Sequence, residues 1–469
     1  MLLLPRPANY HLNCQKLYQF LVASQKNCYK NCFQIVSISL EIDRIDPLAI
    51  LEKLARPHQL NFYFENKSKG EAIAAIDAVA QLQLAGASRF HLTQKFIRSC
   101  LKEIDIFDSS SHTFAKPHFF CSFSFFSETA TDYPFPVATV FLPRWQIARQ
   151  GDRCVLVANL PIEADTNIDV FIQQLWRKIH EITSVEQPEN EGNHFQREFS
   201  QVDVSSNERF KQAVIDCSEL IYARQLSKVV LAHAIDVQAN TNFNLFNCLN
   251  RLRQIHPDCY VFSTNNGKGQ NFIGASPERL ISIRDRQLFT DALAGSISRG
   301  KTAVEDAALA NQLLQSEKER HEHRVVIDFI TQSLQELGIA PQLLSPRLRR
   351  LANIQHLWTP IQAKVPTNVH PLEIVAALHP TPAVGGVSRQ LACKKIRTYE
   401  KFERGLYAAP LGWVNHQGDS EFIVGIRSAL IDGDRARLYA GAGIVAGSNP
   451  DREIAEVRLK LQALLKALI

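Results

Sequence analysis

The sequence predicts an α+β fold in which a large, mostly antiparallel β-sheet core is flanked by helices. In the first half of the chain, segments with strand and helix character alternate irregularly, without the regular strand–helix repeat of a parallel doubly wound sheet. In the second half, the strand-like segments cluster apart from the helical ones, as is typical of α+β proteins. The 469 residues are 45% apolar and 21% charged, which excludes disorder, collagen and coiled coil as descriptions of the whole chain.

Local patterns predict the elements of the first half in order. Leu17, Phe20 and Leu21 have the spacing of one apolar face of a short helix. Residues 35–44 alternate between apolar and polar side chains, as a half-buried strand does. The same criteria predict a helix from Asp46-Pro47 to residue 55, strands at 59–66, 117–126 and 134–146, and a helix at 69–84 entered from Gly70.

The second half follows residues 184–204, a polar stretch with several Asn and Glu residues that is the most linker-like part of the chain. Ser205 and Glu208 have capping-box spacing and predict the start of a helix. One long helix is predicted at about 304–337, and a last helix begins at Pro450. Strands are predicted at 227–237, 259–264, 271–275, 280–291, 410–416, 420–431 and 436–445.

Charge and cysteine usage narrow the classes of function. Lys and Arg total 52 and Asp and Glu 47, so the net charge is only +5, and no basic run is long enough to indicate a nucleic-acid partner. No apolar run approaches about 18 residues, so no membrane-spanning helix is expected. The ten cysteines form no C-x-x-C pair, which favours reduced thiols in a cytoplasmic protein. The basic first forty residues fit a transit peptide or an extra helix, and their low Arg and Ser content favours the helix.

Two pairs of glutamates have matching spacing on two predicted helices. Glu319 and Glu322 lie three residues apart in the long helix, as do Glu453 and Glu456 in the last one, so each pair faces one side of its helix. Carboxylates that face a core need a cation, and two helices offering oxygen ligands suit Mg²⁺. Spacing alone leaves open that these residues are solvated or paired with neighbouring Lys and Arg. The HEH run within the long helix lacks the H-E-x-x-H spacing of a zinc site.

Three isolated charges and two glycine-rich turns are further candidates. Lys228 begins an apolar strand, Glu278 follows a proline, and Arg427 interrupts an apolar strand. A buried lysine can act as a general base, a buried glutamate as a general acid, and an arginine as a bidentate partner of a carboxylate. The turns at 293–300 and 440–448 could bring backbone N–H groups close to an anion. Taken singly, each charge could be a sheet-edge residue and each turn only a tight turn.

Nine sequence blocks occur together and in one order. The blocks are SKVVLA (227–232), FIGASPERL (272–280), ALAGSISRG (292–300), SEKERHEHRVV (316–326), LHPTPAVGG (378–386), RGLYAAPLGWV (404–414), EFIVGIRSA (421–429), LYAGAGIVAGSNPDRE (438–453), and Glu456 with Lys460. In these blocks the chain resembles the chorismate-utilising enzymes, the family of anthranilate synthase component I, and most closely the isochorismate synthases. The blocks cover residues 227–460 densely, whereas the first half resembles the family only at 70–80 and 141–145.

The resemblance implies an isomerase that converts chorismate to isochorismate. Lys228 matches the lysine that activates water for attack at C2 of chorismate, and Glu278 matches the glutamate that protonates the departing C4 hydroxyl. The family fold implies two packed sheets. It also implies that residues 1–34 form an N-terminal extension, and that residues 35–200 and the catalytic region 201–469 form one continuous fold.

The same resemblance implies a metal site and a substrate site. Glu322 and Glu456 match the Mg²⁺ ligands, and Glu319 and Glu453 match residues that hold metal-bound waters. The groups expected to contact the small-molecule substrate chorismate are Gly295, Ser296, His379, Arg427, Gly443 and Lys460.

The blocks RHEH and LHPTPAV resemble the water-using isochorismate branch rather than the ammonia-using anthranilate and aminodeoxychorismate synthases. Three alternatives remain: a salicylate synthase, an ammonia-using anthranilate or aminodeoxychorismate synthase component with a glutaminase partner, and a catalytically silent, chorismate-binding regulatory protein. A binding protein, however, needs neither Lys228 nor Glu278. The chain departs from the family pattern at three positions: Glu319 stands where Asp is common, and Ser388 and Ala409 replace a frequent Pro and Gly. These small changes bear on the exact placement of groups in the site, not on the chemistry. Menaquinone or phylloquinone synthesis is the expected use of the product, with siderophore or salicylate synthesis and the oligomeric state left open.

Overall fold

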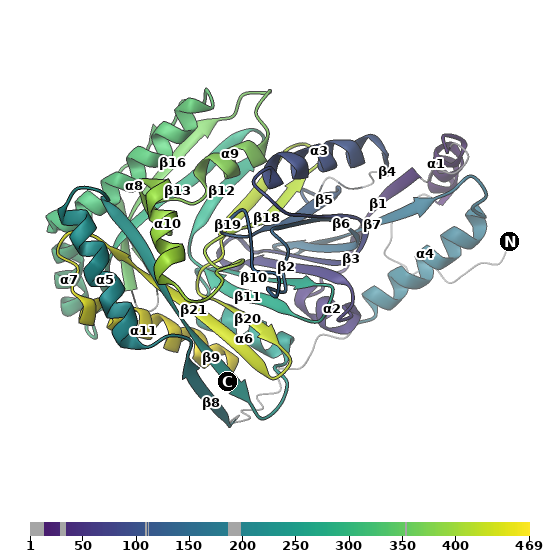
Figure 1. Ribbon diagram of the computed structural model, residues 1–469. Helices are drawn as coiled ribbons and strands as arrows, with labels where there is room; N and C mark the ends of the chain where they lie inside the picture. Colours follow the sequence, from purple (N-terminus) through teal and green to yellow (C-terminus); the bar gives the residue numbers. More distant parts are fainter. Residues whose placement is uncertain (1–13, 29–33, 108–109, 111, 186–197, 352–353) are drawn as a thin grey trace.

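The computed structural model describes every residue except 1–13, 29–33, 108–109, 111, 186–197 and 352–353. Within the described residues, 21 strands form one hydrogen-bonded network, in which every pair is antiparallel except β1 with β4. The predicted α+β class, with a large antiparallel sheet and flanking helices, is confirmed (Figure 1). No helix in this part of the chain is both long enough and apolar enough to span a membrane.

Strands and helices are distributed over the whole described chain. The strands are β1 (Gln34–Ile42), β2 (Leu60–Asn66), β3 (Glu71–Leu84), β4 (Ile104–Phe107), β5 (His118–Phe123), β6 (Ala138–Gln150), β7 (Arg153–Ile162), β8 (Phe199–Asp203), β9 (Lys228–Ala239), β10 (Tyr260–Asn266), β11 (Asn271–Ser276), β12 (Arg279–Arg284), β13 (Gln287–Ser298), β14 (Gln342–Leu343), β15 (Arg347–Arg350), β16 (Ile354–Lys364), β17 (Gly386–Val387), β18 (Pro410–Asn415), β19 (Ser420–Val424), β20 (Ser428–Asp432) and β21 (Arg435–Ile444). The α-helices are α1 (Cys14–Lys26), α2 (Pro47–Leu54), α3 (Arg89–Lys102), α4 (Ile168–Thr183), α5 (Asn207–Tyr222), α6 (Leu245–Ile255), α7 (Ala303–Gln315), α8 (Glu317–Glu336), α9 (Pro371–Leu378), α10 (Arg389–Tyr399) and α11 (Pro450–Leu468).

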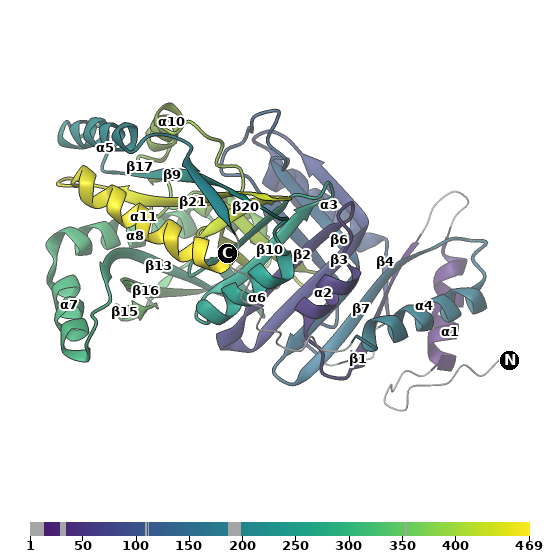
Figure 2. The ribbon, with the colours of Figure 1, turned by 90° about the horizontal axis from the view of Figure 1, so that it is seen from below.

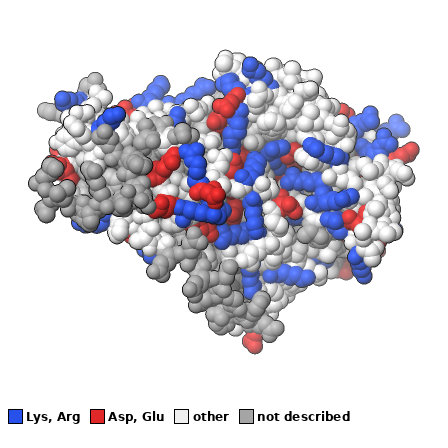
Figure 3. Space-filling view, turned by 180° about the vertical axis from the view of Figure 1, so that it is seen from behind, with Lys and Arg blue, Asp and Glu red and all other residues white. Residues whose placement is uncertain are grey.

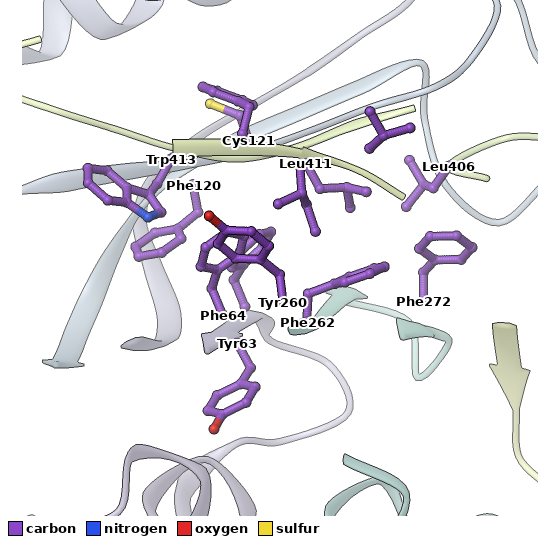
Figure 4. Packing of buried hydrophobic residues seen from close by; sticks show 14 of the residues in the cluster. Tyr63, Phe64, Phe120, Cys121, Tyr260, Phe262, Phe272, Leu406, Leu411 and Trp413 are labelled. Atoms are coloured by element: carbon purple, nitrogen blue, oxygen red, sulfur yellow. The ribbon is translucent and has the colours of Figure 1, made fainter. Parts of the chain in front are cut away.

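The long strands β3 and β6 divide the sheet into two arms. Beside the first half of β3, one arm runs through β2, β10, β11, β20 and β21 to β9. Beside the first half of β6, the other arm runs through β5, β18, β19, β12 and β13 to β16. The arms pack face to face: the rings of Phe62 and Phe120 lie 5.2 Å apart, and Phe262 lies below Leu411 and Trp413 in Figure 4. The two expected packed sheets are therefore two arms of one network.

Helices cover the sheet and place the glutamate pairs. The helix α8 packs on β13 and β16, and α11 packs on β21, with α5 and α6 against its other sides. Figures 1 and 2 show α8 and α11 at one end of the molecule and α1 and α4 at the other. The predicted first helix is present as α1, in which Leu17 and Leu21 are buried. The two glutamate-bearing helices thus lie near one another, each against a different arm.

Residues 71–84 form the whole of strand β3, so the helix predicted at 69–84 is wrong. The strand pairs with β6 along its length and with β2 along its first half. Its alanine content and the spacing of Ile73 and Ile76 favour a helix locally. Residues 72–76 are all buried, however, and a strand covered on both faces lacks the alternation that identifies strands in a sequence. Long-range pairing overrides the local preference here.

Three predicted elements are each divided into two. The predicted strand at 420–431 is β19 and most of β20, with residues 425–427 between them. The predicted helix at 304–337 is α7 and α8, because Ser316 ends the first and its hydroxyl accepts the N–H of Glu319 in the second. The predicted strand at 280–291 covers β12 and the start of β13, which are separated by Asp285 and Arg286, both with positive φ.

The region around residue 200 also differs from the prediction. Ser206 rather than Ser205 caps α5 by accepting the N–H of Arg209. The end of the linker-like stretch 184–204 forms strand β8, and most of the remainder lies outside the described residues. The chain before and after this point shares both arms through the β2–β10 and β5–β18 pairs. The domain division at residue 200 stays a prediction.

Charges of both signs lie side by side on the surface shown in Figure 3. Exposed pairs such as Arg44 with Asp152 contribute little to stability, because water screens them.

Glu421 is a buried charge in the core. It lies on β19 between the two arms, with only 1% of its surface exposed. Its partners are the Tyr260 hydroxyl at 2.7 Å, Lys69 at 2.6 Å and Arg284 at 2.8 Å.

These partners keep Glu421 ionised in the core. Burial alone would raise the pKa of this carboxyl, but Lys69 and Arg284 outweigh burial and hold the pKa at about 2. The folded-state pKa is thus below the ordinary value of 4.5. The resulting stabilisation is complete above that ordinary value and is lost as the pH falls towards 2.

We predict that Glu421→Gln destabilises the protein by about 3 kcal/mol, because two cations lose their buried counter-ion. Urea unfolding at pH 7 would measure the free energy of unfolding. The matched control is Asp152→Asn, which removes a carboxylate from the exposed pair with Arg44 and should have little effect. Equal stability of Glu421→Gln and the wild type would contradict the prediction.

Candidate active site

A cavity of about 170 Å³ lies among β9, β13, β21, α8 and α11. Its walls contain every site residue predicted from the sequence except His379. The predicted residues that line it are Lys228, Glu278, Gly295, Ser296, Glu319, Glu322, Arg427, Gly443, Glu453, Glu456 and Lys460. Residues that are far apart in the chain thus converge on one space.

Lys228 and Glu322 form an ion pair in this cavity. Lys228 is the first residue of β9 and is 2% exposed, and its Nζ lies 2.6 Å from Glu322 Oε1. Gly443 on the neighbouring strand β21 leaves room for this contact. A Cβ atom at that position would lie 3.1 Å from Cε of Lys228 and 3.3 Å from Oε1 of Glu322. A buried ammonium group therefore has one direct carboxylate partner.

Glu278 is a second buried titratable group in the cavity wall. It follows the end of β11, and its N–H donates to the hydroxyl of Ser276, which in turn donates to the carbonyl of Val424. Burial raises the pKa of Glu278 to about 7, with Lys228 acting in the opposite direction and Asp291 in the same one. At neutral pH this carboxyl is about half protonated and can donate a proton.

The glutamates of α8 and α11 share this cavity, as the resemblance implied. Burial raises the pKa of Glu319, and the neighbouring charges of Glu322 and Glu456 raise it further. Burial and the charges of Glu456 and Glu322 likewise raise the pKa of Glu453, although a hydrogen bond from Ser448 lowers it. Part of each rise thus comes from repulsion between these carboxylates, which a cation would relieve.

The chemistry of these ligands fits Mg²⁺. All four offer carboxylate oxygens, the ligands that this hard cation prefers. Among the described residues, no group of three or more His, Cys, Asp or Glu side chains forms a ready-made metal cage. Mg²⁺ usually takes one or two protein carboxylates and keeps several waters, so Glu322 and Glu456 suffice as direct ligands.

Arg427 and Lys460 are two further cations in the cavity wall. Arg427 lies between β19 and β20 rather than within a predicted strand, and its φ is +51°. Burial lowers the pKa of its guanidinium, and no carboxylate of the described chain pairs with it. Lys460 Nζ contacts Glu456 at 2.7 Å and donates to the carbonyl of Gly441 at 2.9 Å. A half-buried guanidinium without a carboxylate partner is suited to a carboxylate ligand.

The glycine-rich turn at 293–300 brings Ser296 to the cavity. Gly295 has φ +78°, and a Cβ atom there would lie 3.1 Å from the carbonyl oxygen of Glu319, so glycine suits both the backbone conformation and the close approach. The N–H of Ser296 donates to Glu319 Oε2 at 3.0 Å. This N–H, which the sequence suggested for the substrate, therefore already has a partner, and the Ser296 hydroxyl is the more available group.

His356 and Tyr407 are among the residues that line the cavity but were not predicted from the sequence. His356 lies on β16, a strand that the sequence analysis did not predict, and its Nδ1 shares a 2.8 Å hydrogen bond with the hydroxyl of Ser296. Burial and the nearby Arg427 lower the pKa of His356 well below its usual range, so the ring is neutral at pH 7. Tyr407 stacks on Tyr439 with centroids 5.2 Å apart. It lies within the block 404–414, so the motif itself was a signal that could have found it.

His379 does not reach the cavity, so the predicted contact with the substrate ring finds no support. Its Nε2 lies 2.9 Å from the carbonyl oxygen of Phe125, and its ring packs against the ring of that residue. Ala383 and Val384, which follow it in the same block, do line the cavity. His379 therefore supports the segment that forms this wall.

Residues 20–469 match the family model described as chorismate binding enzyme. The chain belongs to this family. A salicylate biosynthesis isochorismate synthase of Pseudomonas aeruginosa is 41% identical over 272 residues, which are 57% of each chain. The isochorismate synthase MenF of Bacillus subtilis is 29% identical over 448 residues, which are 92% of this chain and 93% of the relative.

A solved structure is similar over nearly the full length. The menaquinone-specific isochorismate synthase MenF of Escherichia coli has a TM-score of 0.77 and 26% identity, and the match covers 97% of this chain and all of the other. The predicted family and enzyme class, an isomerase of the isochorismate synthase kind, are confirmed by these matches. The roles of individual residues remain predictions.

We predict that Glu319→Gln raises the melting temperature without Mg²⁺ by about 2 °C, because one of the mutually repelling carboxylates loses its charge. It should also reduce the rise in melting temperature that Mg²⁺ causes, since binding to the folded state stabilises it. Thermal unfolding with and without Mg²⁺ measures both effects. Glu336→Gln, at the exposed far end of α8, is the control. A lower melting temperature in Glu319→Gln, or an unchanged response to Mg²⁺, would disprove the assignment.

Proposed function

We propose that this protein converts chorismate to isochorismate in a Mg²⁺-dependent reaction. The observation that carries the proposal is that Lys228 and Glu278 line one cavity together with both glutamate pairs. With a pKa of about 7, Glu278 is partly protonated at neutral pH. The names of the relatives support the same reaction. Water adds at C2 and the C4 hydroxyl leaves as water while the ring double bonds shift, so atoms balance and the reaction is an isomerisation.

The cavity residues provide a proton donor and a proton acceptor. The neutral amino form of Lys228 takes a proton from the incoming water as that water adds at C2, and Glu322, 2.6 Å away, pairs with the ammonium group that is formed. The protonated form of Glu278 donates to the oxygen leaving C4, which turns a poor leaving group into water. Burial raises the pKa of Glu278 to about 7, so a large fraction of the molecules carry its acid form at neutral pH.

The remaining groups bind the two carboxylates of the substrate. Arg427 and Lys460 supply positive charge, and the hydroxyl of Ser296, held by His356, supplies a hydrogen-bonding group. Glu322 and Glu456 would hold Mg²⁺, with Glu319 and Glu453 against its waters. When bound, the ion would anchor a substrate carboxylate and stabilise the negative charge that develops on it.

The cellular role follows from the same relatives. We propose that the product feeds menaquinone or phylloquinone synthesis, because the menaquinone-specific MenF of Escherichia coli matches this chain over nearly its full length. The relative from a salicylate pathway supports an alternative use of the same product. The proposed location is the cytoplasm, which the scattered cysteines of the sequence, without a C-x-x-C pair, support.

The direct test is to incubate the protein with chorismate and Mg²⁺, with and without ammonium, and to identify the product by NMR. We expect isochorismate alone. Lys228→Ala and Glu278→Gln should each lower kcat by about 10³-fold, because each removes one proton-transfer group. Lys268→Ala, on an exposed loop, is the control and should keep full activity. Salicylate, an amino adduct or no product would each select one of the alternatives and refute this proposal.

The pH dependence is a separate prediction. The acid form of Glu278 is the active one, so kcat/KM should fall by about tenfold per pH unit above about 7, the pKa of this carboxyl. Steady-state rates from about pH 5.5 to about pH 9 would measure this fall in kcat/KM. Circular dichroism over the same range would show that the fold persists. A profile that stays flat through this range would show that Glu278 is not the proton donor.

A further inference from the structure

Arg458 lies on the face of α11 that points away from the cavity. Successive residues of an α-helix turn by about 100°, so Arg458 is roughly opposite Glu456 and Lys460. Its guanidinium donates to Oδ2 of Asp203 and, at 2.6 Å, to Oδ1 of Asn207. Asp203 ends β8 and Asn207 begins α5, so one side chain connects three elements behind the active site.

Asp203 extends this contact to β9. Its second oxygen, Oδ1, lies 3.3 Å from Nε2 of His233, which is fully buried on that strand. Lys228 is the first residue of the same strand. Asp203 therefore connects the strand that carries Lys228 with the helix that carries Glu456, although neither Asp203 nor Arg458 lines the cavity.

The apolar contacts of α11 do not fix its orientation. Buried leucines such as Leu461 pack against its neighbours, but apolar contacts have no preferred direction. Hydrogen bonds do depend on direction and weaken steeply when distorted. Among the polar contacts of α11 with α5 and α6, the ion pair of Asp451 with Lys211 is largely exposed, and Arg251 reaches only the last residue of the chain. The guanidinium of Arg458 is thus the partly buried directional contact in the middle of the helix, and it connects α11 to β8, which is exposed over most of its length.

We propose that the contact of Asp203 with Arg458 positions α11, so that Glu456 faces Glu322 of α8 at the separation that one Mg²⁺ ion needs. Asp203 and Arg458 are positioning residues and touch neither substrate nor metal. The inference rests on the proposed function, because it assumes that Glu322 and Glu456 are the metal ligands.

The test is Arg458→Met, which keeps the length of the side chain and removes its donors. The Kd for Mg²⁺, obtained from the rise in melting temperature over a series of Mg²⁺ concentrations, should increase about tenfold, the lower end of what supporting residues contribute at metal sites. The Mg²⁺ concentration for half-maximal rate should increase equally, while kcat at saturating Mg²⁺ stays close to that of the wild type. A merely structural role would instead lower the melting temperature and leave both measures of Mg²⁺ affinity unchanged.

Two further variants complete a double-mutant cycle. Asp203→Asn should weaken Mg²⁺ binding in the same way, and the double variant should add little to either single one, because both remove one contact. Asp203→Asn also serves if Arg458→Met fails to fold. Arg437→Met, which breaks an exposed pair with Asp236 between β21 and β9, is the matched control and should leave Mg²⁺ binding unchanged.

The outcomes separate the two proposals. Unchanged Mg²⁺ binding in Arg458→Met and Asp203→Asn, or independent effects that add fully in the double variant, would overturn the positioning role. A wild type that shows no Mg²⁺-dependent rise in melting temperature would also overturn it. A wild type that binds Mg²⁺ but makes no isochorismate would refute the proposed function, while the melting-temperature cycle would still decide the role of Arg458.

Discussion

The buried carboxylate of Glu421 holds together the two arms from which the cavity is assembled. Lys228 and Gly443 come from the arm that ends in β9, whereas Gly295 and Ser296 come from the arm that ends in β16, so neither arm contains the whole site. Glu421 accepts hydrogen bonds from both arms, and a buried charge is stable only while its partners stay within bonding distance. The geometry of the cavity therefore depends on an ion pair that lies outside it.

Many charged side chains lie together in the cavity, although the net charge of the whole chain is only +5. Lys228 pairs with Glu322 and Lys460 pairs with Glu456, so the protein itself compensates two of the four glutamates. The other two, Glu319 and Glu453, have raised pKa values because burial and like charges disfavour their ionised forms. A substrate with two carboxylates would add further negative charge to this space. A divalent cation is thus the component that makes binding of such a substrate compatible with the four glutamates.

The parts of the site that follow from short-range geometry could be predicted from the sequence. Residues three apart on a helix share a face in any fold, which is why the pairs around Glu322 and Glu456 were found by spacing. The helix predicted at 69–84 was wrong because pairing between distant strands, which no local pattern records, decides the conformation of β3. His356 was missed for the same reason, since β16 places it beside Ser296 through the pairing with β13. The positive φ of Arg427 likewise depends on how β19 and β20 meet, not on the apolar residues around it.

Motifs contain the atoms that touch a ligand, but the distances between those atoms depend on how whole elements are held. Glu322 and Glu456 lie on helices that pack against different arms, so no local interaction sets their separation. Asp203 lies at the end of a polar stretch that has the composition of a linker, and it gains its role only because β8 pairs with β9 and brings it to Arg458. Residues that determine metal affinity in this protein are therefore to be sought behind the helices and outside the nine blocks. There, polar side chains connect elements that each carry one half of the site.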